Sequence, residues 1–179
     1  LINRESIRSL LSRLIVAGGT EELVHEIVLR IPKLATGALC KSISAAKSNL
    51  GLRLLRSDLS FNMDRVEALL LGKYNAAGSL WDRLVAADET GILIDELLER
   101  VPGAETDALC ACIRVPRGEM GVRLLQRPES EYDMARVEAL LINRESIRSL
   151  LSRLIVAGGT EELVHEIVLR IPKLATGAL

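Results

Sequence analysis

Residues 21–32 read Glu-Glu-Leu-Val-His-Glu-Ile-Val-Leu-Arg-Ile-Pro, and much of the architecture follows from this stretch. Its apolar side chains recur at spacings of three and four residues, which places them along one face of an α-helix. Residues 91–102 keep apolar side chains at the five corresponding positions, and residues 161–172 repeat the stretch without a change. The pattern therefore predicts an amphipathic helix that occurs three times in the chain.

The recurrence of this helix belongs to a longer repeat. Residues 1–39 return unchanged as residues 141–179, a shift of 140 positions. Because packing alone tolerates many apolar exchanges, an unchanged copy indicates recent duplication, homogenisation of the DNA or deliberate construction. Within the 140-residue unit, Arg65–Leu70 reappears as Arg136–Leu141. An older repeat of about 70 residues therefore lies inside the younger one.

These two periods predict the organisation of the chain. We expect a first helical repeat at residues 1–70, a second at residues 71–141 and a partial third at residues 142–179, which is identical to residues 2–39 and starts a new 140-residue unit. Stacked repeats would share one continuous core.

Each repeat is predicted to contain five short helices, A to E. Apolar side chains at helical spacing mark them in the first repeat near residues 7–15, 23–31, 34–43, 50–56 and 63–70. Thr20 and Thr90 are predicted to cap helix B, because a hydroxyl at this position can accept a hydrogen bond from a free backbone amide. Pro32 and Pro102 are predicted to end helix B and to start the next helix. The predicted fold class is all-α, with five-helix repeats stacked as an array.

Composition and charge exclude several classes of protein. Apolar residues make up 49% of the chain and aromatic residues only 2%, and 23 basic residues face 24 acidic ones. Nucleic-acid binding is disfavoured, since it requires a basic surface or aromatic stacking platforms. No apolar run reaches the length of a membrane span, and three cysteines do not make a disulfide framework. A reducing, cytoplasmic location is therefore expected.

The side chains that commonly carry catalysis are few. His25 and its copy His165 are interpreted as surface or partly buried helix residues, because the second repeat has Asp95 at this position. Cys110 and Cys112 lack the two-residue spacer of a redox or zinc motif, and we expect them to be small helix residues with at least one in the core. No enzymatic activity is predicted.

One group of residues could bind a metal ion. Gly18 and Gly19 precede helix B, and Asp58 lies between helices D and E. Glycine-rich turns can direct backbone carbonyls at a hard cation, and a carboxylate from a second turn would complete an oxygen cage for calcium. In the alternative interpretation, the glycines only end helix A and Asp58 caps helix E.

The sequence at this point resembles the annexin repeat. Residues 19–28 are similar to the annexin Gly-Thr-acidic-acidic start of helix B, and residues 56–60 followed by Arg65–Leu70 are similar to its D-to-E turn and helix E. The resemblance implies a five-helix repeat whose A-to-B carbonyls and D-to-E carboxylate hold calcium, with Gly19 and Asp58 at ligand positions. The implied activity is calcium-dependent docking on acidic phospholipid.

The chain departs from the annexin pattern in several places. Gly18 is adjacent to Gly19 instead of one residue apart from it. In the second repeat, residues 86–90 contain no glycine, although Glu129 keeps the acid, which leaves a degenerate second site. A generic α-solenoid would explain the helices equally well.

These observations lead to an expected function. Identical modules in tandem present identical faces at fixed spacing, which gains from multivalency. We expect a non-enzymatic structural or scaffolding protein, annexin-like and associated with the cytoskeleton or membrane cortex, that binds protein partners or itself. The alternative is calcium-dependent binding of acidic phospholipid membranes.

Overall fold

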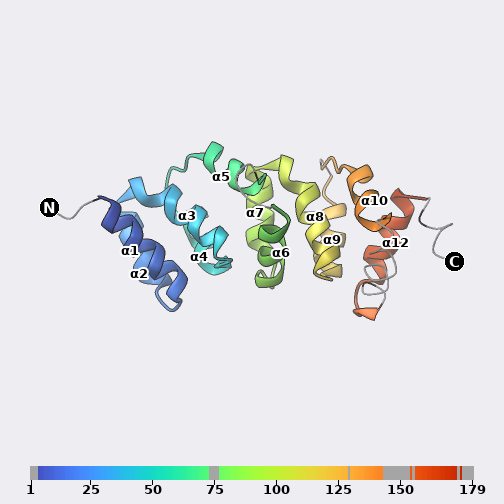
Figure 1. The fold of residues 1–179 in the computed structure, drawn as a ribbon, viewed down its shortest axis with the longest axis horizontal. Coiled ribbons are helices and arrows are strands. Elements are labelled where there is room, and N and C mark those ends of the chain that lie inside the picture. The colour runs from blue at the N-terminus through green and yellow to red at the C-terminus, as the bar shows by residue number, and fades with distance from the viewer. Residues whose placement is uncertain are drawn as a thin grey trace. The chain divides into compact units, whose positions relative to one another are not determined.

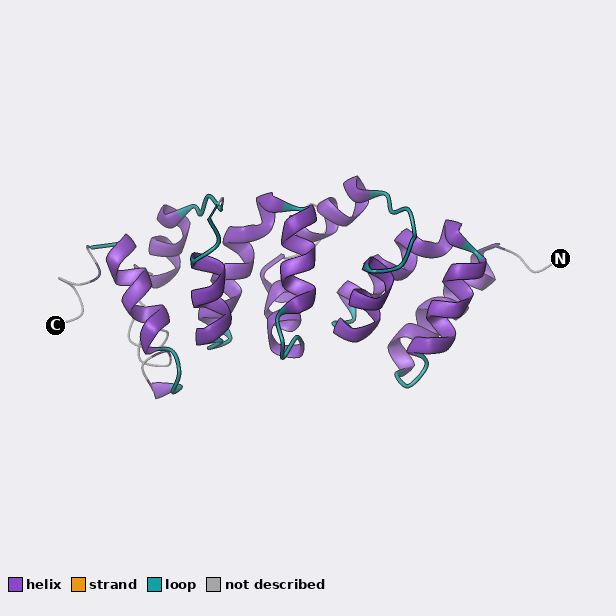
Figure 2. Ribbon diagram, turned by 180° about the vertical axis from the view of Figure 1, so that it is seen from behind, coloured by secondary structure: helices purple, strands orange, loops and turns teal. Residues whose placement is uncertain are grey.

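The computed structural model describes residues 4–72, 77–128, 130–142, 154, 156–172 and 174. Every regular element in these ranges is a helix, and they contain no strand (Figure 2). The all-α prediction is therefore confirmed. None of the described helices is both long enough and apolar enough to cross a bilayer.

The chain divides into two compact units, unit 1 at Leu1–Val101 and unit 2 at Pro102–Leu179. Figure 1 labels the helices of both. Unit 1 holds α1 (Arg4–Ala17), α2 (Glu21–Arg30), the 3₁₀ helix η1 (Pro32–Leu34), α3 (Ala35–Ser44), α4 (Ser48–Leu55), α5 (Met63–Leu70), α6 (Ala77–Ala87) and α7 (Ile92–Arg100). Unit 2 holds η2 (Pro102–Ala104), α8 (Glu105–Arg114), α9 (Gly118–Leu125), α10 (Met134–Ile142) and α12 (Glu161–Arg170).

The unit boundary lies inside the second predicted repeat, between its helices B and C. Unit 1 thus contains helices A to E of the first repeat together with A and B of the second. The repeat boundaries at residues 70 and 141 remain predictions from the sequence.

Helix α3 lies at the centre of unit 1, where it contacts α1, α4 and α5. Its buried face includes Leu39 and Ile43, neither of which is exposed to solvent. Helix α6 joins this core through Trp81, which is fully buried and whose indole Nε1–H donates a 3.0 Å hydrogen bond to the Leu70 carbonyl at the end of α5. A buried indole needs such a partner for its N–H.

The core of unit 2 is built from α8, α9, α10 and α12. Its buried residues are Leu109, Cys110, Ile113, Val122, Leu125, Val137, Leu141, Leu154, Leu163, Ile167 and Ile171. Leu163 and Ile167 belong to α12, so the exact copy of helix B contributes to the core of this unit.

Several helix ends follow the sequence prediction. Gly18 and Gly19 have φ values of +75° and +69° and end α1 in the left-handed region that glycine adopts without strain. Pro32 begins η1 directly after α2. Proline fits there because the first helical residue needs no hydrogen-bonded amide.

The predicted caps of helix B are confirmed in part. Thr20 is the N-cap residue of α2, but its hydroxyl makes no capping bond and donates to the Leu14 carbonyl at 2.6 Å, because α1 also leaves carbonyls without partners at its end. In the second repeat Gly91 is the N-cap residue of α7, and the Thr90 hydroxyl accepts the Ile92 amide at 3.4 Å. The buried carboxylate of Asp88 accepts the amides of Gly91 and Ile94, both at 3.1 Å, so Asp88 and Thr90 together hold the start of α7.

Asp58 does not cap the helix that follows it. Helix α5 begins five residues later, and the Asn62 side chain accepts the Arg65 amide at 3.1 Å. Asp133 accepts the Arg136 amide at 3.0 Å in the corresponding place in unit 2. The alternative interpretation of Asp58 as the cap of helix E is therefore wrong.

Candidate functional site

The turn that carries two of the predicted calcium ligands lies next to a positive charge. Gly18 lies beside the ammonium group of Lys47, whose Nζ would be 3.3 Å from a Cβ placed on Gly18. A cation in this turn would be repelled by that charge.

Among the residues that the structure describes, no three His, Cys, Asp or Glu side chains lie close enough to hold one ion. Glu129 of the degenerate second site lies outside the described residues. The calcium site remains a prediction from the sequence.

His25 connects two helices of the first repeat. Its Nε2 lies 2.6 Å from the Ser57 hydroxyl oxygen, and that hydroxyl lies 2.7 Å from the Arg53 carbonyl. The single hydroxyl hydrogen of Ser57 is used on the carbonyl, so His25 is the donor and carries its hydrogen on Nε2. His25 is half-buried, as expected, and fastens α2 to the end of α4.

The cysteines are packed in the interior more completely than predicted. Cys110 and Cys112 are both buried, and burial raises the pKa of the Cys112 thiol to about 12. Burial also raises the pKa of Cys40 and Cys110. Since the thiolate is the nucleophile, all three environments disfavour reactivity.

A recurring helix contact is the most distinctive feature of both units. In unit 1, α4 packs against α7, and in unit 2, α9 packs against α12. In both units helix D of one predicted repeat packs against helix B of the next. We call this contact the joint.

Each joint contains a glycine facing a leucine. A Cβ on Gly51 of α4 would lie 3.3 Å from the Leu93 side chain of α7, and a Cβ on Gly121 of α9 would lie 2.7 Å from the Leu163 side chain of α12. Glycine and leucine are each shifted by 70 positions between the two joints. The joint is therefore the same contact made twice, with the glycine permitting close approach.

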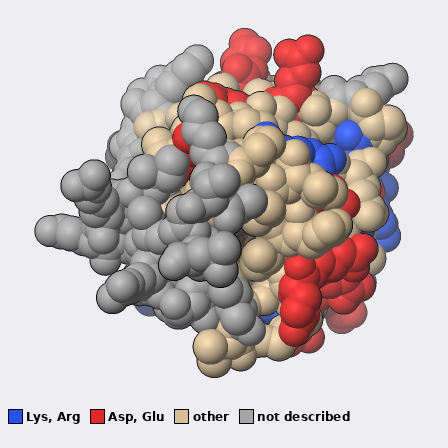
Figure 3. Space-filling model, turned by 90° about the vertical axis from the view of Figure 1, so that its right-hand side faces the viewer, with Lys and Arg blue, Asp and Glu red and all other residues tan. Residues whose placement is uncertain are grey.

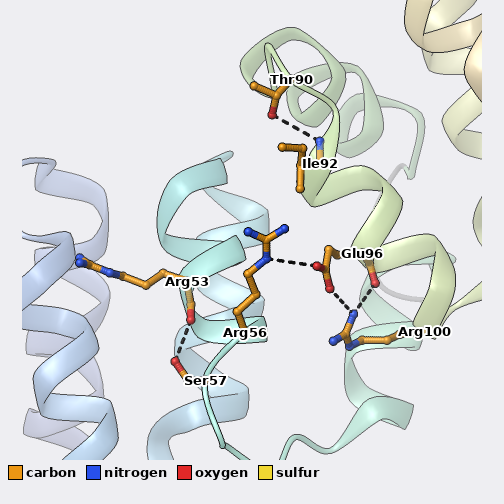
Figure 4. A network of polar contacts seen from close by, with 7 residues as sticks. All are labelled: Arg53, Arg56, Ser57, Thr90, Ile92, Glu96 and Arg100. Atoms are coloured by element: carbon orange, nitrogen blue, oxygen red, sulfur yellow. Dashed lines mark hydrogen bonds and ion pairs between the residues drawn. The ribbon is translucent and has the colours of Figure 1, made fainter.

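A Glu–Arg pair on helix B borders the joint in both units, but the bond that crosses the joint differs between them. In unit 1 the Glu96 carboxylate accepts Arg56 Nε of α4 at 3.2 Å and Arg100 Nη1 at 2.7 Å (Figure 4). The hydrogen bond from Arg100, followed by that from Arg56, lowers the pKa of Glu96. In unit 2, Arg170 pairs with Glu166 and donates from Nη2 to the Leu125 carbonyl of α9 at 3.0 Å.

The same helix surface is uncovered at α2. Leu23 is 53% exposed, whereas its identical copy Leu163 is 0% exposed beneath α9. The Arg30 side chain is likewise 82% exposed and that of its copy Arg170 only 36%. We call Leu23, Glu26 and Arg30 the open face of α2. It has the sequence of a joint surface and lacks the helix that covers that surface in unit 2.

One feature of the sequence points to this contact. Diverged repeats exchange most residues, yet a glycine stands in the interior of helix D in both, at Gly51 and Gly121. A helix-interior glycine is unfavourable unless a close approach requires it, so its recurrence indicates a contact surface.

A polar pocket lies between α1, α3 and α5 of unit 1. Its volume is about 170 Å³, and three cations line it, Arg8, Lys33 and Arg65. A wider adjoining pocket of about 580 Å³ shares Arg65 and adds Lys41. In contrast, the side of unit 2 seen in Figure 3 carries both acidic and basic side chains.

Comparison with known proteins adds no family to these observations, because no family model, curated protein or solved structure matches the chain.

Proposed function

We propose that this chain is a non-enzymatic scaffold, an array of annexin-like helical repeats that binds other proteins through surfaces repeated along it. The joint supports this proposal, since the same helix contact with the same glycine and leucine occurs in both units. A contact that recurs every 70 residues adds further repeats without a new interface.

The single observation that carries the proposal is that two identical stretches of sequence differ in their burial. Leu23 and Leu163 have the same neighbours in sequence, and only Leu163 is buried. Burying a leucine side chain contributes roughly 2 kcal/mol. The open face of α2 is therefore a surface on which another helix D of the same kind gains stability by packing.

Chemical labelling of a cysteine on the open face tests this proposal. A chain extended by residues 71–140 in front of Leu1 recreates the sequence junction between residues 140 and 141. In a Cys40→Ala background, Leu23→Cys should react rapidly with a maleimide in the 179-residue chain. It should be strongly protected in the extended chain, because its position then matches that of Leu163.

The matched control is Leu29→Cys on the same helix. Leu29 is exposed, and its copy Leu169 remains exposed in unit 2, so labelling should be equal in both chains. Equal labelling of Leu23→Cys in the two chains would show that the joint does not extend beyond α2, and the array proposal would be wrong.

A further inference from the structure

The pocket between α1, α3 and α5 has an unbalanced positive charge. Arg8, Lys33 and Arg65 line it, and the structure gives none of them an ion pair with another residue whose side chain it describes. None of the residues lining the pocket is acidic. Three cations around one pocket repel one another, and a bound anion would relieve that repulsion.

In the second repeat, the positive charge at the corresponding arginine is neutralised by a carboxylate. The counterpart of Arg65 is Arg136, which forms an ion pair with the buried carboxylate of Asp107. This hydrogen bond raises the pKa of the Arg136 guanidinium. Asp107 corresponds to Gly37, which lines the pocket in the first repeat. Arg65 therefore lacks the partner that its counterpart has.

The other two cations are also specific to the first repeat. Lys33 corresponds to Gly103, and Arg8 corresponds to Gly78. In the second repeat the counterparts of Arg8 and Lys33 thus carry no charge, and the counterpart of Arg65 is paired with Asp107. The two diverged repeats differ at three of the four positions, Arg8, Lys33 and Gly37, and each difference favours an anion site in the first repeat and disfavours one in the second.

We propose that this pocket binds a phosphate monoester, presented by a phosphorylated side chain of a protein partner. Arginine holds a phosphate through two parallel N–H bonds, and lysine adds a point charge. The Ser12 hydroxyl also lines the pocket, and the Thr36 hydroxyl accepts the Asn62 amide at 2.9 Å, which leaves its hydrogen available to donate.

The size of the pocket agrees with a single phosphate group. A volume of about 170 Å³ is far more than one water requires and leaves room for a phosphate group among the three cations. The choice of a protein as the source rests on the proposed scaffold function, because in such an array the site would recur once per 140 residues, which suits a partner with several modified segments.

Calorimetric titration of the 179-residue chain with inorganic phosphate, O-phosphoserine and a phosphoserine peptide tests the site directly. Binding of all three is expected, with the unphosphorylated peptide and acetate as inactive comparisons. The affinity should fall as the pH is lowered through about 6, where a phosphate monoester takes up a proton. Equal binding of acetate, or no binding of phosphate, would overturn the proposal.

The decisive variant copies the second repeat into the first. A Cβ on Gly37 meets nothing within 4 Å, so Gly37→Asp should fold normally and pair with Arg65 as Asp107 pairs with Arg136. It should weaken phosphate binding about tenfold or more, and Arg65→Gln should have a similar effect. Gly37→Asn has the same shape without the charge and should retain binding, as should Lys47→Gln outside the pocket.

The remaining outcomes separate this site from other sources and from the array. Unchanged binding in Gly37→Asp and Arg65→Gln, with unchanged thermal unfolding, would show that the anion lies elsewhere and overturn the assignment. Binding to phosphatidylcholine vesicles containing phosphatidylinositol 4-phosphate, without binding to the phosphopeptide, would overturn a protein source. The phosphate titrations do not involve the joint. Phosphate binding can therefore be absent while Leu23→Cys is protected in the extended chain, and phosphate can bind while Leu23→Cys is not protected.

Discussion

At the residue scale, single polar groups hold the turns of this chain in ways that differ between repeats. The first repeat makes its A-to-B turn with two left-handed glycines and a threonine that bonds back to α1. The second repeat makes the turn with one left-handed residue, Gly91, and the buried carboxylate of Asp88. Similar turns are thus built from different chemistry.

Asp88 should be one of the most sensitive loop positions. Asp88→Ala removes the carboxylate that accepts two backbone amides, so the Ile94 amide loses this partner and the Gly91 amide keeps only its 3.3 Å bond to the Asp88 carbonyl, which should lower the free energy of unfolding by about 2 kcal/mol. Asp88→Asn keeps one acceptor oxygen and should cost less. Urea unfolding followed by circular dichroism measures both changes, and equal stability of all three proteins would contradict this role.

At the phosphate pocket, two equivalent arginines have different surroundings that the sequence alone does not reveal. Arg65 and Arg136 occupy equivalent positions in a string that both repeats share, so a sequence comparison treats them alike. Their environments differ because Gly37 and Asp107, almost 30 residues away along the chain, lie beside them in the fold. Charge balance at a site depends on neighbours that only the fold brings together.

At the scale of helices, glycines in helix D set how closely two repeats approach. Gly118 begins α9, and a Cβ there would lie 1.9 Å from the Gly159 carbonyl oxygen. Ser48 occupies the corresponding place in α4, where a pocket of about 380 Å³ lies between it and residues 87–90. Unit 2 is therefore packed more tightly than unit 1 at this end of the joint.

The substitution Gly118→Ala should destabilise unit 2. The added methyl group meets backbone, which cannot rotate away, so Gly118→Ala should destabilise by about 1–3 kcal/mol. Hydrogen exchange of the α12 amides should increase in parallel. Gly37→Ala is the control, because it adds the same methyl group where nothing lies within 4 Å. It should raise the free energy of unfolding by about 0.5–1 kcal/mol, since alanine favours a helix interior over glycine. Similar effects of both substitutions would show that the close contact is unimportant.

Helices are also where the sequence was most informative. The three- and four-residue spacing of apolar side chains predicted helix B correctly because burial along one face determines that pattern. Boundaries agreed to within two residues: helices C and D were expected near residues 34–43 and 50–56, and α3 spans Ala35–Ser44 and α4 spans Ser48–Leu55. The joint could not be predicted from periodicity, since Leu23 and Leu163 have identical surroundings in sequence and differ only in what packs against them.

At the scale of the whole molecule, both helices D of the described residues are already packed against a helix B. Helix α4 is occupied by α7, and α9 is occupied by α12. Neither of these two helices is therefore available to cover α2 of a second copy.

Removing residues 143–179 should change this. A chain of residues 1–142 keeps α10 to its last residue and uncovers α9, so α9 of one molecule can pack on α2 of the next. Sedimentation velocity should show concentration-dependent assembly of the shortened chain and none of the 179-residue chain. Leu23→Asp should block that assembly, because it places a charge in a surface that α9 would bury. A folded, monomeric shortened chain would contradict this expectation.

The glycine and leucine of the joint also give any such assembly a direction. One partner supplies the notch at Gly121 and the other the knob at Leu23, the copy of Leu163, and neither surface matches itself. Contacts between unlike surfaces are heterologous and form rings or open-ended strands, not closed twofold dimers. A repeat that offers the notch but carries a charge in place of its own knob would act as a chain terminator. Growth could thus be stopped at one chosen end, which makes the length of an array controllable by a single residue.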